Sequence, residues 1–530
     1  MGGRKLSDSA DTGSGNTEAG TSRLDGLTTW DAPWRGLRVV VTGIGLSGFS
    51  AADTLIELGA RVVVVDAKDT EENRAKADTL QIVGAADVLL GADSAKELPL
   101  VDGEPAELVV TSPGFSPSHP LMTAASDAGI PVWGDVELAW RVRVREGRKT
   151  AEWLTITGTN GKTTTVSMTE SMLRAAGLRA IAAGNVGTPI LDAIRDPQGY
   201  DVIAVELSSF QLHWSSSISP LASVCLNIAE DHVDWHGSYE AYLADKAKIY
   251  ENTRVACIYN AEQSETEHMV EEADVVEGCR AVGFTTGMPA VSMVGMVENL
   301  LVDRAFIEQR KDSAAELASL ADVGEPAPRH MVANALAAAA LVRAFGVEPV
   351  AVRDGLRAYA PGAHRIQPVA RLNDILWVDD SKATNPHAAA ASLSAFDPVV
   401  WIAGGLSKGV DYDDLVRTQA PRLRAVILIG ADSSRLREAL ARHAPGIRVI
   451  DAVPPHTGGR PASVPVVSGE EVMALAVAAA AAEARSGDTV LMAPAAASMD
   501  QFASYAHRGD AFIEAVRGYV EGQAQTTKES

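Results

Sequence analysis

The segment Trp153-Leu154-Thr155-Ile156-Thr157-Gly158-Thr159-Asn160-Gly161-Lys162-Thr163-Thr164 joins a short apolar run to a polar turn that contains two glycines. The apolar run predicts a buried strand, and the residues after the turn predict a helix over Val166–Ala175. In such a unit the backbone N–H groups of the turn converge on phosphate oxygens, and the start of the helix adds partial positive charge. Lys162 can then reach the terminal phosphates, and Thr163 can bind Mg²⁺. We therefore predict that Gly158–Thr164 forms a nucleotide phosphate loop.

This loop is a shortened variant, because the general pattern has a further glycine at the position of Ile156. The alternative is an ordinary strand-to-helix turn that happens to contain Gly161, Lys162 and Thr163. The position of the turn, directly after a strand and before a helix, favours the phosphate loop.

Short β-branched runs alternate with longer Ala- and Leu-rich segments along the whole chain. Strands this apolar are buried on both faces, which requires parallel sheets covered by helices. The predicted fold class is therefore α/β. The expected strands are Arg38–Val41, Arg61–Val65, Leu108–Thr111, Trp153–Thr157, Val202–Glu206, Val224–Asn227, Val399–Ala403, Ala425–Ile429 and Thr489–Met492.

A chain of 530 residues is too long for one core, and two weakly patterned stretches divide it, Arg141–Thr150 and Ala360–Gly362. A stretch rich in Ser, Gly, Thr and Asp at the start predicts a disordered tail. Pro454–Pro465 predicts a surface loop. The expected divisions are a tail over 1–33, domains over 34–145, 146–361 and 362–520, and a second tail over 521–530.

The composition excludes several classes of protein. The chain has 46 basic and 69 acidic residues, a formal net charge of −23, so we expect neither nucleic acid nor an anionic membrane as a partner. Cys225, Cys257 and Cys279 contain no C-x-x-C pair and predict buried free thiols. No apolar run reaches the roughly 18 residues that span a bilayer, and the N-terminal stretch lacks the apolar core of a signal peptide. We expect a cytoplasmic protein.

A second glycine-rich turn, Gly43-Ile44-Gly45-Leu46-Ser47-Gly48, also lies between a predicted strand and a helix, and Asp66 ends the next strand. This arrangement is typical of dinucleotide-binding domains. The alternative is that the glycines only let a helix pack closely on a strand. Both interpretations predict a Rossmann-like first domain able to hold a nucleotide diphosphate.

Ionisable residues follow two further strands. Glu206 ends a predicted strand, at the usual position of a carboxylate that holds Mg²⁺ opposite a phosphate loop. Glu230-Asp231-His232-Val233-Asp234 follows the strand Val224–Asn227, and Lys246 comes shortly after. A single histidine is more often structural, but ligands of α/β proteins bind at the carboxyl ends of strands. We therefore predict a functional role for His232.

Three polar loops follow predicted strands in the last third of the chain: Asp379–Pro386, Gly404–Lys408 and Ala495–Phe502. Each loop alone is an ordinary turn. The carboxyl ends of parallel strands meet at one edge of a sheet, so the three loops together predict a site for a small charged substrate.

Taken together, these residues resemble the Mur ligase family over nearly the whole chain, from about residue 36 to residue 518. GTNGKTT alone indicates only a wider group that includes folylpolyglutamate synthases, whereas DSKATN and ASMDQF resemble the family member that adds D-glutamate. The motifs that carry the resemblance are GTNGKTT, GNVG (Gly184–Gly187), ELSSFQL (Glu206–Leu212), Glu230–His232, His364–Arg365, DDSKATN (Asp379–Asn385), ASMDQF (Ala497–Phe502) and Arg508–Gly509.

The resemblance implies an ATP-dependent ligase with a Rossmann-like domain for the UDP substrate, a central ATPase domain of the phosphate-loop type, and a Rossmann-like C-terminal domain for the amino acid. The carboxylate of UDP-N-acetylmuramoyl-L-alanine would attack the γ-phosphate of ATP, and the amine of D-glutamate would then displace phosphate from the acyl phosphate. Metal ions and Lys162 would neutralise the anions that meet in the first step. The implied cofactors are ATP and Mg²⁺, and the expected state is a monomer.

The resemblance also implies roles for individual residues. Lys162, His232 and Lys246 would be catalytic, and Thr163, Glu206, His232 and a carbamylated Lys246 would hold Mg²⁺. ATP would be bound by Gly158, Thr159, Asn160, Gly161, Lys162, Thr163, Thr164, Asn334, Arg365 and Asp380. The UDP substrate would be contacted by Leu46, Ser47, Asp66, Lys68, Ser112, Pro113, Gly114, Asn185 and Gln211. D-Glutamate would be surrounded by Lys382, Thr384, Lys408, Ser498 and Tyr505.

The chain departs from the family pattern in two places. Tyr505 stands where phenylalanine is expected, which adds a hydroxyl to the amino-acid pocket. Ala67 and Lys68 leave the contacts to uracil open.

Three other functions fit parts of the sequence. A folylpolyglutamate synthase would resemble only the central and C-terminal parts, and the GIGLSG loop argues against it. An NAD-dependent oxidoreductase would use Gly43–Gly48 and Asp66 but leave GTNGKTT without a function. A non-enzymatic Mur-like partner protein should have lost part of the set Lys162, Glu206, His232 and Lys246, and all four are present.

Overall fold

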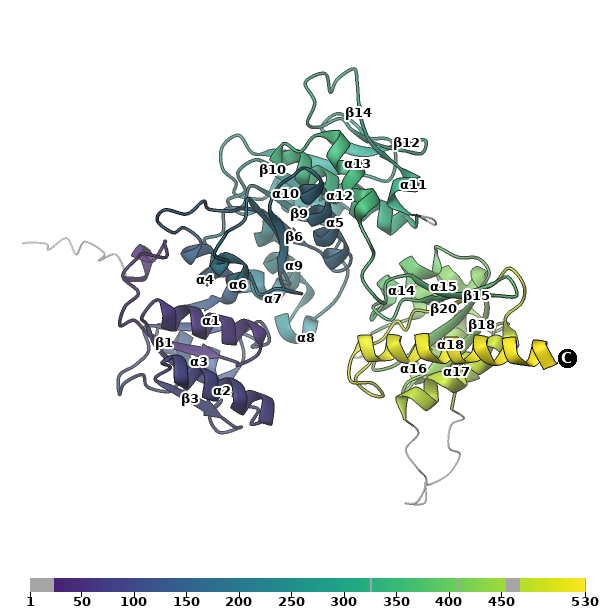
Figure 1. The fold of residues 1–530 in the computed structure, drawn as a ribbon, viewed down its shortest axis with the longest axis horizontal. Helices are drawn as coiled ribbons and strands as arrows, with labels where there is room; N and C mark the ends of the chain where they lie inside the picture. Colours follow the sequence, from purple (N-terminus) through teal and green to yellow (C-terminus); the bar gives the residue numbers. More distant parts are fainter. Residues whose placement is uncertain (1–22, 325–326, 408–409, 454–467, 530) are drawn as a thin grey trace, which may run out of the picture. The chain divides into compact units, whose positions relative to one another are not determined.

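The structure is a computed structural model that describes residues 23–324, 327–407, 410–453 and 468–529. It divides into two compact units, Met1–Thr150 with Ile194–Gly199, and Ala151–Ala193 with Tyr200–Ser530. Each unit is described separately below, and Figure 1 labels the elements of both. No helix among the described residues is long and apolar enough to cross a membrane.

The first unit contains a parallel five-stranded sheet in the order β3-β2-β1-β4-β5. This order places β1 at the centre, and Val39, Val40 and Val41 of that strand are fully buried. The strands are β1 (Arg38–Thr42), β2 (Arg61–Asp66), β3 (Asp87–Leu90), β4 (Leu108–Thr111) and β5 (Val132–Gly134), and the helices are α1 (Leu46–Glu57), α2 (Glu71–Val83), α3 (Pro120–Asp127) and α4 (Asp135–Val142). The strand order is that of a Rossmann fold, as predicted.

Residues 23–33, which were expected to belong to the N-terminal tail, are folded. Residues 23–26 form the 3₁₀ helix η1 (Arg23–Gly26), and Leu24, Leu27 and Trp30 are buried. The backbone N–H of Trp30 donates to the Val144 carbonyl at 2.8 Å. A few large apolar residues in an otherwise polar stretch are enough to attach it to the core. The prediction missed them because it was made from the average composition of the stretch. Residues 1–22 lie outside the described residues.

The second unit begins with a nine-stranded sheet in the order β14-β13-β12-β11-β10-β9-β6-β8-β7. Pairing is parallel from β7 to β12, and the β12–β13 and β13–β14 pairs are antiparallel. The strands are β6 (Glu152–Thr157), β7 (Ala180–Gly184), β8 (Val202–Glu206), β9 (Ala222–Cys225), β10 (Ala256–Asn260), β11 (Arg280–Phe284), β12 (Met293–Val297), β13 (Leu300–Asp303) and β14 (Ala315–Ser319). Because β6 lies between β8 and β9, the carboxyl ends of these three strands bring their loops together.

Helices cover the nine-stranded sheet on both faces. The Ala-rich helix α12 (Arg329–Phe345) packs on α5 (Lys162–Ala175), and all residues from Ala335 to Val342 are fully buried. Small side chains allow this close approach between helix and sheet. The other helices are α6 (Ile190–Arg195), which crosses the division between the units, α7 (Ser209–His213), α8 (Val233–His236), α9 (Tyr239–Ala247), η2 (Lys248–Tyr250), α10 (Ser264–Glu271), α11 (Leu320–Val323) and α13 (Pro349–Ala358).

The last part of the second unit contains a six-stranded sheet in the order β15-β16-β20-β17-β18-β19, parallel except for the β15–β16 pair. Its strands are β15 (Gln367–Leu372), β16 (Ile375–Asp379), β17 (Val399–Gly404), β18 (Leu423–Ile429), β19 (Arg448–Asp451) and β20 (Thr489–Met492). Its helices are α14 (Pro386–Leu393), α15 (Asp413–Gln419), η3 (Ala420–Arg422), α16 (Ser434–His443), α17 (Gly469–Glu483) and α18 (Tyr505–Glu529). The C-terminal helix α18, yellow in Figure 1, packs on α17.

The α/β fold class is confirmed, and two other predictions change. The tail expected over 521–530 is helical as far as Glu529, because α18 continues through it. Cys225 and Cys257 are buried free thiols as predicted, but Cys279 is only partly buried and its Sγ lies 3.7 Å from that of Cys257. The expected loop Pro454–Pro465 lies outside the described residues.

Candidate active site

The predicted phosphate loop follows β6 and leads into α5. Gly161 is the N-cap of α5 with φ 86°, and Gly158 has φ 149°, both in a region that favours glycine. A Cβ on Gly161 would lie 2.4 Å from Oδ1 of Asn334, so α12 packs directly against the loop at this point. Glycine is therefore required here by both backbone conformation and space.

Two side chains that sequence reasoning missed hold the loop in shape. Asn227 accepts a hydrogen bond from the Asn160 N–H at Oδ1 (2.9 Å) and donates from Nδ2 to the Asn160 carbonyl (3.0 Å). The Thr159 hydroxyl lies 2.7 Å from the Tyr242 hydroxyl on α9. Neither residue belongs to a motif that would identify it, because both act through contacts distant in sequence.

Lys162 lies at the start of α5 and is turned back over the loop. Its Nζ donates to the carbonyls of Gly158 (2.7 Å) and Thr159 (3.0 Å). Burial lowers the pKa of Lys162, and the carboxylates of Glu206 and Asp231 partly oppose this effect. The adjacent Thr163 is partly buried, and Thr164 is buried.

Glu206 ends β8 beside the loop and is 1% exposed. Its Oε1 accepts a hydrogen bond from Asn185 Nδ2 at 2.9 Å, while Oε2 is buried with no hydrogen-bond partner among the residues that the structure describes. A buried carboxylate oxygen without a partner is costly. An oxygen of this kind suits a hard cation such as Mg²⁺, which prefers oxygen ligands. The hydroxyl of Thr163, the residue after Lys162, is a second oxygen of the same kind of site.

Lys246 on α9 contacts the same loop from a different direction. Its Nζ donates to the Gly158 carbonyl (3.0 Å) and to the Thr157 hydroxyl (3.2 Å), so Lys162 and Lys246 share one carbonyl. The side chain is 2% exposed, and burial together with the nearby charge of Lys162 lowers the pKa of Lys246 to about 7. The amine is therefore poised to lose its proton.

His232 is the N-cap of the short helix α8, with φ 53°. Its half-exposed ring lies edge-on to Phe210, with 4.8 Å between ring centroids. Gln211, predicted to contact substrate, is buried and forms a capping box with Ser208, whose N–H donates to Gln211 Oε1 at 3.1 Å. The structure thus gives Gln211 a role in starting α7.

In the first unit, the glycine-rich turn Gly43–Gly48 packs closely against its neighbours. A Cβ on Gly48 would lie 1.9 Å from the Gly43 carbonyl oxygen, as expected of a close-packing device. Both carboxylate oxygens of Asp66 accept backbone N–H groups, Oδ2 from Ile44 (2.9 Å) and Oδ1 from Lys68 (2.8 Å). Asp66 therefore holds the turn itself.

The other residues predicted to contact the UDP substrate lie around this turn. Leu46 is 71% exposed, and the neighbouring Ser47 is partly buried. Ser112 follows β4, and its buried hydroxyl has no partner within the part of the chain that the structure describes. An exposed apolar tip and a buried hydroxyl beside it are features of a binding surface. Pro113 and Gly114 continue the same loop.

In the last part of the chain, the loop after β16 carries Asp380 and Lys382. The backbone N–H of Ile366, next to Arg365, donates to Asp380 Oδ1 at 3.2 Å. Burial raises the pKa of Asp380 to about 6. Lys382 Nζ lies 3.8 Å from the centre of the Tyr505 ring, a cation–π contact, and burial together with Arg365 lowers the pKa of Lys382 to about 8.

Arg508, which sequence reasoning quoted only as part of a motif, ties these loops together. It is fully buried and donates to Ser381 Oγ (3.0 Å), the Ser381 carbonyl (3.0 Å) and the Ala496 carbonyl (3.1 Å). Ser498 is buried in the same loop as Ala496, and Thr384 N–H donates to the Lys382 carbonyl. The loops after β16 and β20 are thus brought together as predicted. Lys408 lies outside the described residues.

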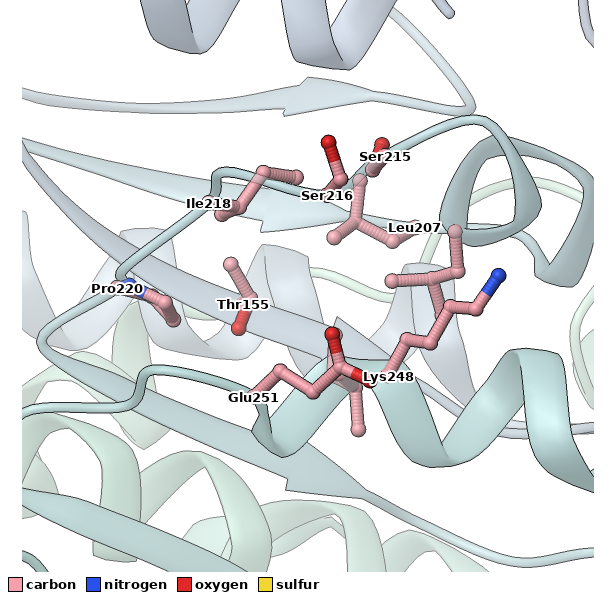
Figure 2. A pocket seen from close by; sticks show the side chains of 10 residues that line it. Thr155, Leu207, Ser215, Ser216, Ile218, Pro220, Lys248 and Glu251 are labelled. Carbon is pink, nitrogen blue, oxygen red and sulfur yellow. The ribbon is translucent and has the colours of Figure 1, made fainter. Parts of the chain in front are cut away.

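A small pocket is lined by residues of β6, α7, η2 and the loops beside them (Figure 2). Its lining mixes apolar residues with Ser215, Ser216, Lys248 and Glu251. None of the lining residues is a predicted site residue, so this pocket is distinct from the phosphate loop.

The fold and the loop define a nucleotide-using enzyme, and comparison with known sequences defines its class. Residues 156–342 match the Mur ligase middle domain, 364–496 the Mur ligase glutamate ligase domain, and 37–134 the N-terminal domain described as Mur ligase MurD-like. The chain belongs to the Mur ligase family. Members of this family are ATP-dependent ligases that form amide bonds and use ATP and Mg²⁺.

Curated relatives share the whole length of the chain. A UDP-N-acetylmuramoylalanine–D-glutamate ligase of Streptomyces avermitilis is 57% identical over 485 residues, covering 92% of this chain and 99% of the relative. A ligase of the same name from Leifsonia xyli is 53% identical over 518 residues, covering 96% and 97%.

Two solved structures show the same fold at low sequence identity. The MurC UDP-N-acetylmuramate-alanine ligase of Thermotoga maritima has a TM-score of 0.50 at 18% identity, covering 91% of this chain and 100% of the other. A UDP-N-acetylmuramoylalanyl-D-glutamyl-2,6-diaminopimelate–D-alanyl-D-alanyl ligase from Acinetobacter baumannii has a TM-score of 0.52 at 16% identity, covering 91% and 93%. These likenesses support the three-domain α/β architecture.

Proposed function

We propose that this chain joins D-glutamate to UDP-N-acetylmuramoyl-L-alanine in an ATP-dependent reaction, a cytoplasmic step of peptidoglycan precursor synthesis. Full-length identity of 57% to a ligase of that name supports the substrate assignment. The structural observation that carries the chemistry is the convergence of Lys162 and Lys246 on the Gly158 carbonyl, beside the unpartnered carboxylate oxygen of Glu206. The Lys162 ammonium, the Lys246 amine and one buried carboxylate at a phosphate loop suit the transfer of a phosphoryl group.

In the first step the substrate carboxylate attacks the γ-phosphate of ATP, the bond from that phosphorus to the bridging oxygen breaks, and ADP leaves. The two reactants are both anions, so positive charge must lie between them. Lys162 supplies such a charge, and its present bonds to loop carbonyls would be exchanged for bonds to phosphate oxygens. The backbone N–H groups of Gly158–Thr164 bind the remaining phosphate oxygens.

Thr163, Glu206, His232 and Lys246 would hold Mg²⁺, which when bound supplies positive charge to the transferring phosphoryl group. A protonated lysine repels a cation, and a neutral amine is a poor ligand for so hard an ion. The neutral amine of the buried Lys246 would attack the carbon of CO₂ and release one proton, which forms a carbamate with two oxygens and one negative charge. Carbamylation makes Lys246 a suitable ligand.

In the second step the D-glutamate amine attacks the acyl phosphate carbon, and phosphate leaves from the tetrahedral intermediate. The proposed amino-acid site is the edge where the loops after β16 and β20 meet. Arg508 joins these loops, and Lys382 over Tyr505 presents a cation suited to a carboxylate. The residues assigned to D-glutamate are Lys382, Thr384, Lys408, Ser498 and Tyr505.

The remaining assignments follow the same division of the chain. Asn334, Arg365 and Asp380 are assigned to the nucleotide, and the surface around Leu46, Ser47, Asp66, Lys68 and Ser112–Gly114 to the UDP substrate, with Asn185 near its reacting end. The close approach of the Asn334 side chain to Gly161 supports the assignment of Asn334 to the nucleotide. We further propose domains over 34–145, 146–361 and 362–520, and a monomeric enzyme.

A phosphate-release assay with UDP-N-acetylmuramoyl-L-alanine and a panel of amino acids tests this function. We expect release that requires ATP, Mg²⁺ and the UDP substrate, with D-glutamate as the preferred amine. Equal rates with L-lysine or meso-diaminopimelate would contradict the assignment.

A further inference from the structure

Asp245 is a buried carboxylate that the mechanism above does not use, although it precedes Lys246 on α9. Its Oδ2 accepts hydrogen bonds from Nδ1 of both His213 (2.8 Å) and His236 (2.9 Å), and its Oδ1 accepts from Lys248 Nζ (2.9 Å). Burial alone would raise the pKa of Asp245, but these partners outweigh it and hold the pKa below its ordinary value. Three donors from three elements thus converge on one anion.

His236 links Asp245 to a further residue, Ser209. An ionised carboxylate only accepts, so Nδ1 of the fully buried His236 must carry the proton. Burial lowers the pKa of His236, and in its neutral form Nε2 accepts from the Ser209 hydroxyl at 2.9 Å. Asp245 therefore holds α7 at both ends, directly through His213 at its last residue and through His236 at its first residue, Ser209.

Phe210 lies between these two ends of α7, and its ring contacts His232. The Phe210 ring stacks on His236 with 5.6 Å between centroids and lies 4.6 Å from Trp235. Its other contact is His232, 4.8 Å away and edge-on. His232 and His236 are the N-cap and the last residue of α8, so fixing His236 and Phe210 fixes the place of His232 as well.

Lys248 takes part in the same arrangement. Its Nζ donates to Asp245 and to the His213 carbonyl (3.3 Å), and its side chain lines the pocket in Figure 2. The Lys248 ammonium is therefore paired within this group of residues. We refer to Asp245, His213, His236, Lys248 and Ser209 together as the Asp245 cluster.

We propose that Asp245 is a positioning residue of the ligase reaction, which fixes α7 and α8 against α9 and so fixes the position of His232 against Phe210. This inference rests on the proposed function for the role of His232. A displacement of about 1 Å in a catalytic group can reduce turnover about 100-fold. Loss of the cluster should therefore lower kcat, while KM for D-glutamate, whose proposed site lies on the six-stranded sheet, should change little.

The test compares Asp245→Asn with Asp303→Asn. Asp303 is also a buried carboxylate, and the hydrogen bonds that it accepts come from Arg343, Ala305 and Phe306, which lie outside α7, α8 and α9. We expect Asp245→Asn to lower kcat about 10- to 100-fold with KM for D-glutamate within threefold, and Asp303→Asn to lower the melting temperature with kcat within twofold. His236→Phe, which keeps the ring, should lower kcat similarly, and the double variant should lose little more.

A readout independent of activity is the NMR spectrum of enzyme labelled with ¹⁵N-histidine. The wild type should show two low-field Nδ1 protons bonded to a carboxylate, and Asp245→Asn should lose both. Unchanged kcat in a folded Asp245→Asn enzyme, additive effects in the double variant, or absence of the low-field protons from the wild type would each overturn the proposal. Wild-type enzyme inactive with D-glutamate would instead overturn the proposed function, which the NMR readout does not depend on.

Discussion

The side chain of Asn227 holds the backbone of Asn160 at both of its polar groups. Oδ1 accepts the Asn160 N–H at 2.9 Å, and Nδ2 donates to the Asn160 carbonyl at 3.0 Å. Asn160 lies in the middle of the phosphate loop. Before it come Gly158 and Thr159, whose carbonyls accept hydrogen bonds from lysines, and after it comes Gly161, the N-cap of α5. The loop is therefore held in shape by the segment that directly follows β9.

Asn227→Ala should raise KM for ATP about tenfold, because the loop loses the support that aligns its N–H groups. The chain offers a matched control in Gln263, which makes the same pair of bonds to Ile228, next to Asn227 (2.7 and 2.5 Å). Both substitutions leave two backbone groups unpaired and should each destabilise folding by about 1–3 kcal/mol. Steady-state kinetics and thermal unfolding measure the two effects, and an equal rise in KM for Gln263→Ala would show that the loop contact is not the cause.

Lys162→Ala should abolish turnover while the UDP substrate still binds nearly as well. Removing a cation aimed at the transferring phosphoryl group costs transition-state stabilisation, on the order of 10²-fold or more in rate. Calorimetric titration with the UDP substrate and phosphate release measure the two parts. Lys311→Ala, an exposed lysine of the same unit, is the control and should behave as wild type. Activity of Lys162→Ala within threefold of wild type would show that this loop is not the ATP site.

Lys246→Ala should be nearly inactive, because the enzyme loses the proposed carbamate. Small carboxylic acids added to the variant should restore part of the rate by supplying an anion in its place. Incubation of the wild type with ¹³CO₂ should give a carbamate carbon signal that Lys246→Ala lacks. A fully active Lys246→Ala enzyme, or a bare amine in the active Mg²⁺ complex, would leave carbamylation without support.

KM for D-glutamate should rise as pH increases above about 8. The pKa of Lys382 is lowered to about 8 by burial and by Arg365, so the ammonium that would bind the substrate carboxylate is present below that pH and lost above it. Well above pH 8 the rise should approach tenfold per pH unit, while KM for ATP should not follow it. Lys382→Arg keeps its charge at high pH, so its KM should stay flat from pH 7.5 to 9.5. A wild-type KM independent of pH over this range would reassign Lys382 to a structural role.

Apolar runs predicted the central strands well, because those strands are buried on both faces and need no long-range information. The strand expected over Val399–Ala403 is covered by β17, and seven of the other predicted strands are likewise covered. The strand expected over Val224–Asn227 is only half right, because β9 both begins and ends two residues earlier. Eleven of the twenty strands that the described residues form were missed, including the buried parallel strand β10. The missed strands β13 and β14 are short and antiparallel, and they join the sheet by pairing β13 with β12 and β14 with β13.

The site could be predicted where local motifs carry it and not where distant contacts do. Lys162 and Glu206 follow strands in recognisable patterns. Arg508 binds Ser381, which is 127 residues away, and no local spacing announces that contact. Gln211 lies inside a motif, and its capping of α7 is a structural role that the motif did not indicate.

The hydrogen bonds of Asp66 separate two requirements in the first unit that would otherwise compete. The shape of the turn depends on its base, on Asp66 and on the absence of a side chain at Gly48, whereas its tip is formed by Leu46 and Ser47. During evolution, substitutions at the tip can therefore change which sugar nucleotide is bound without loss of the turn. The base tolerates no such drift, so selection should act on these adjacent positions at very different rates.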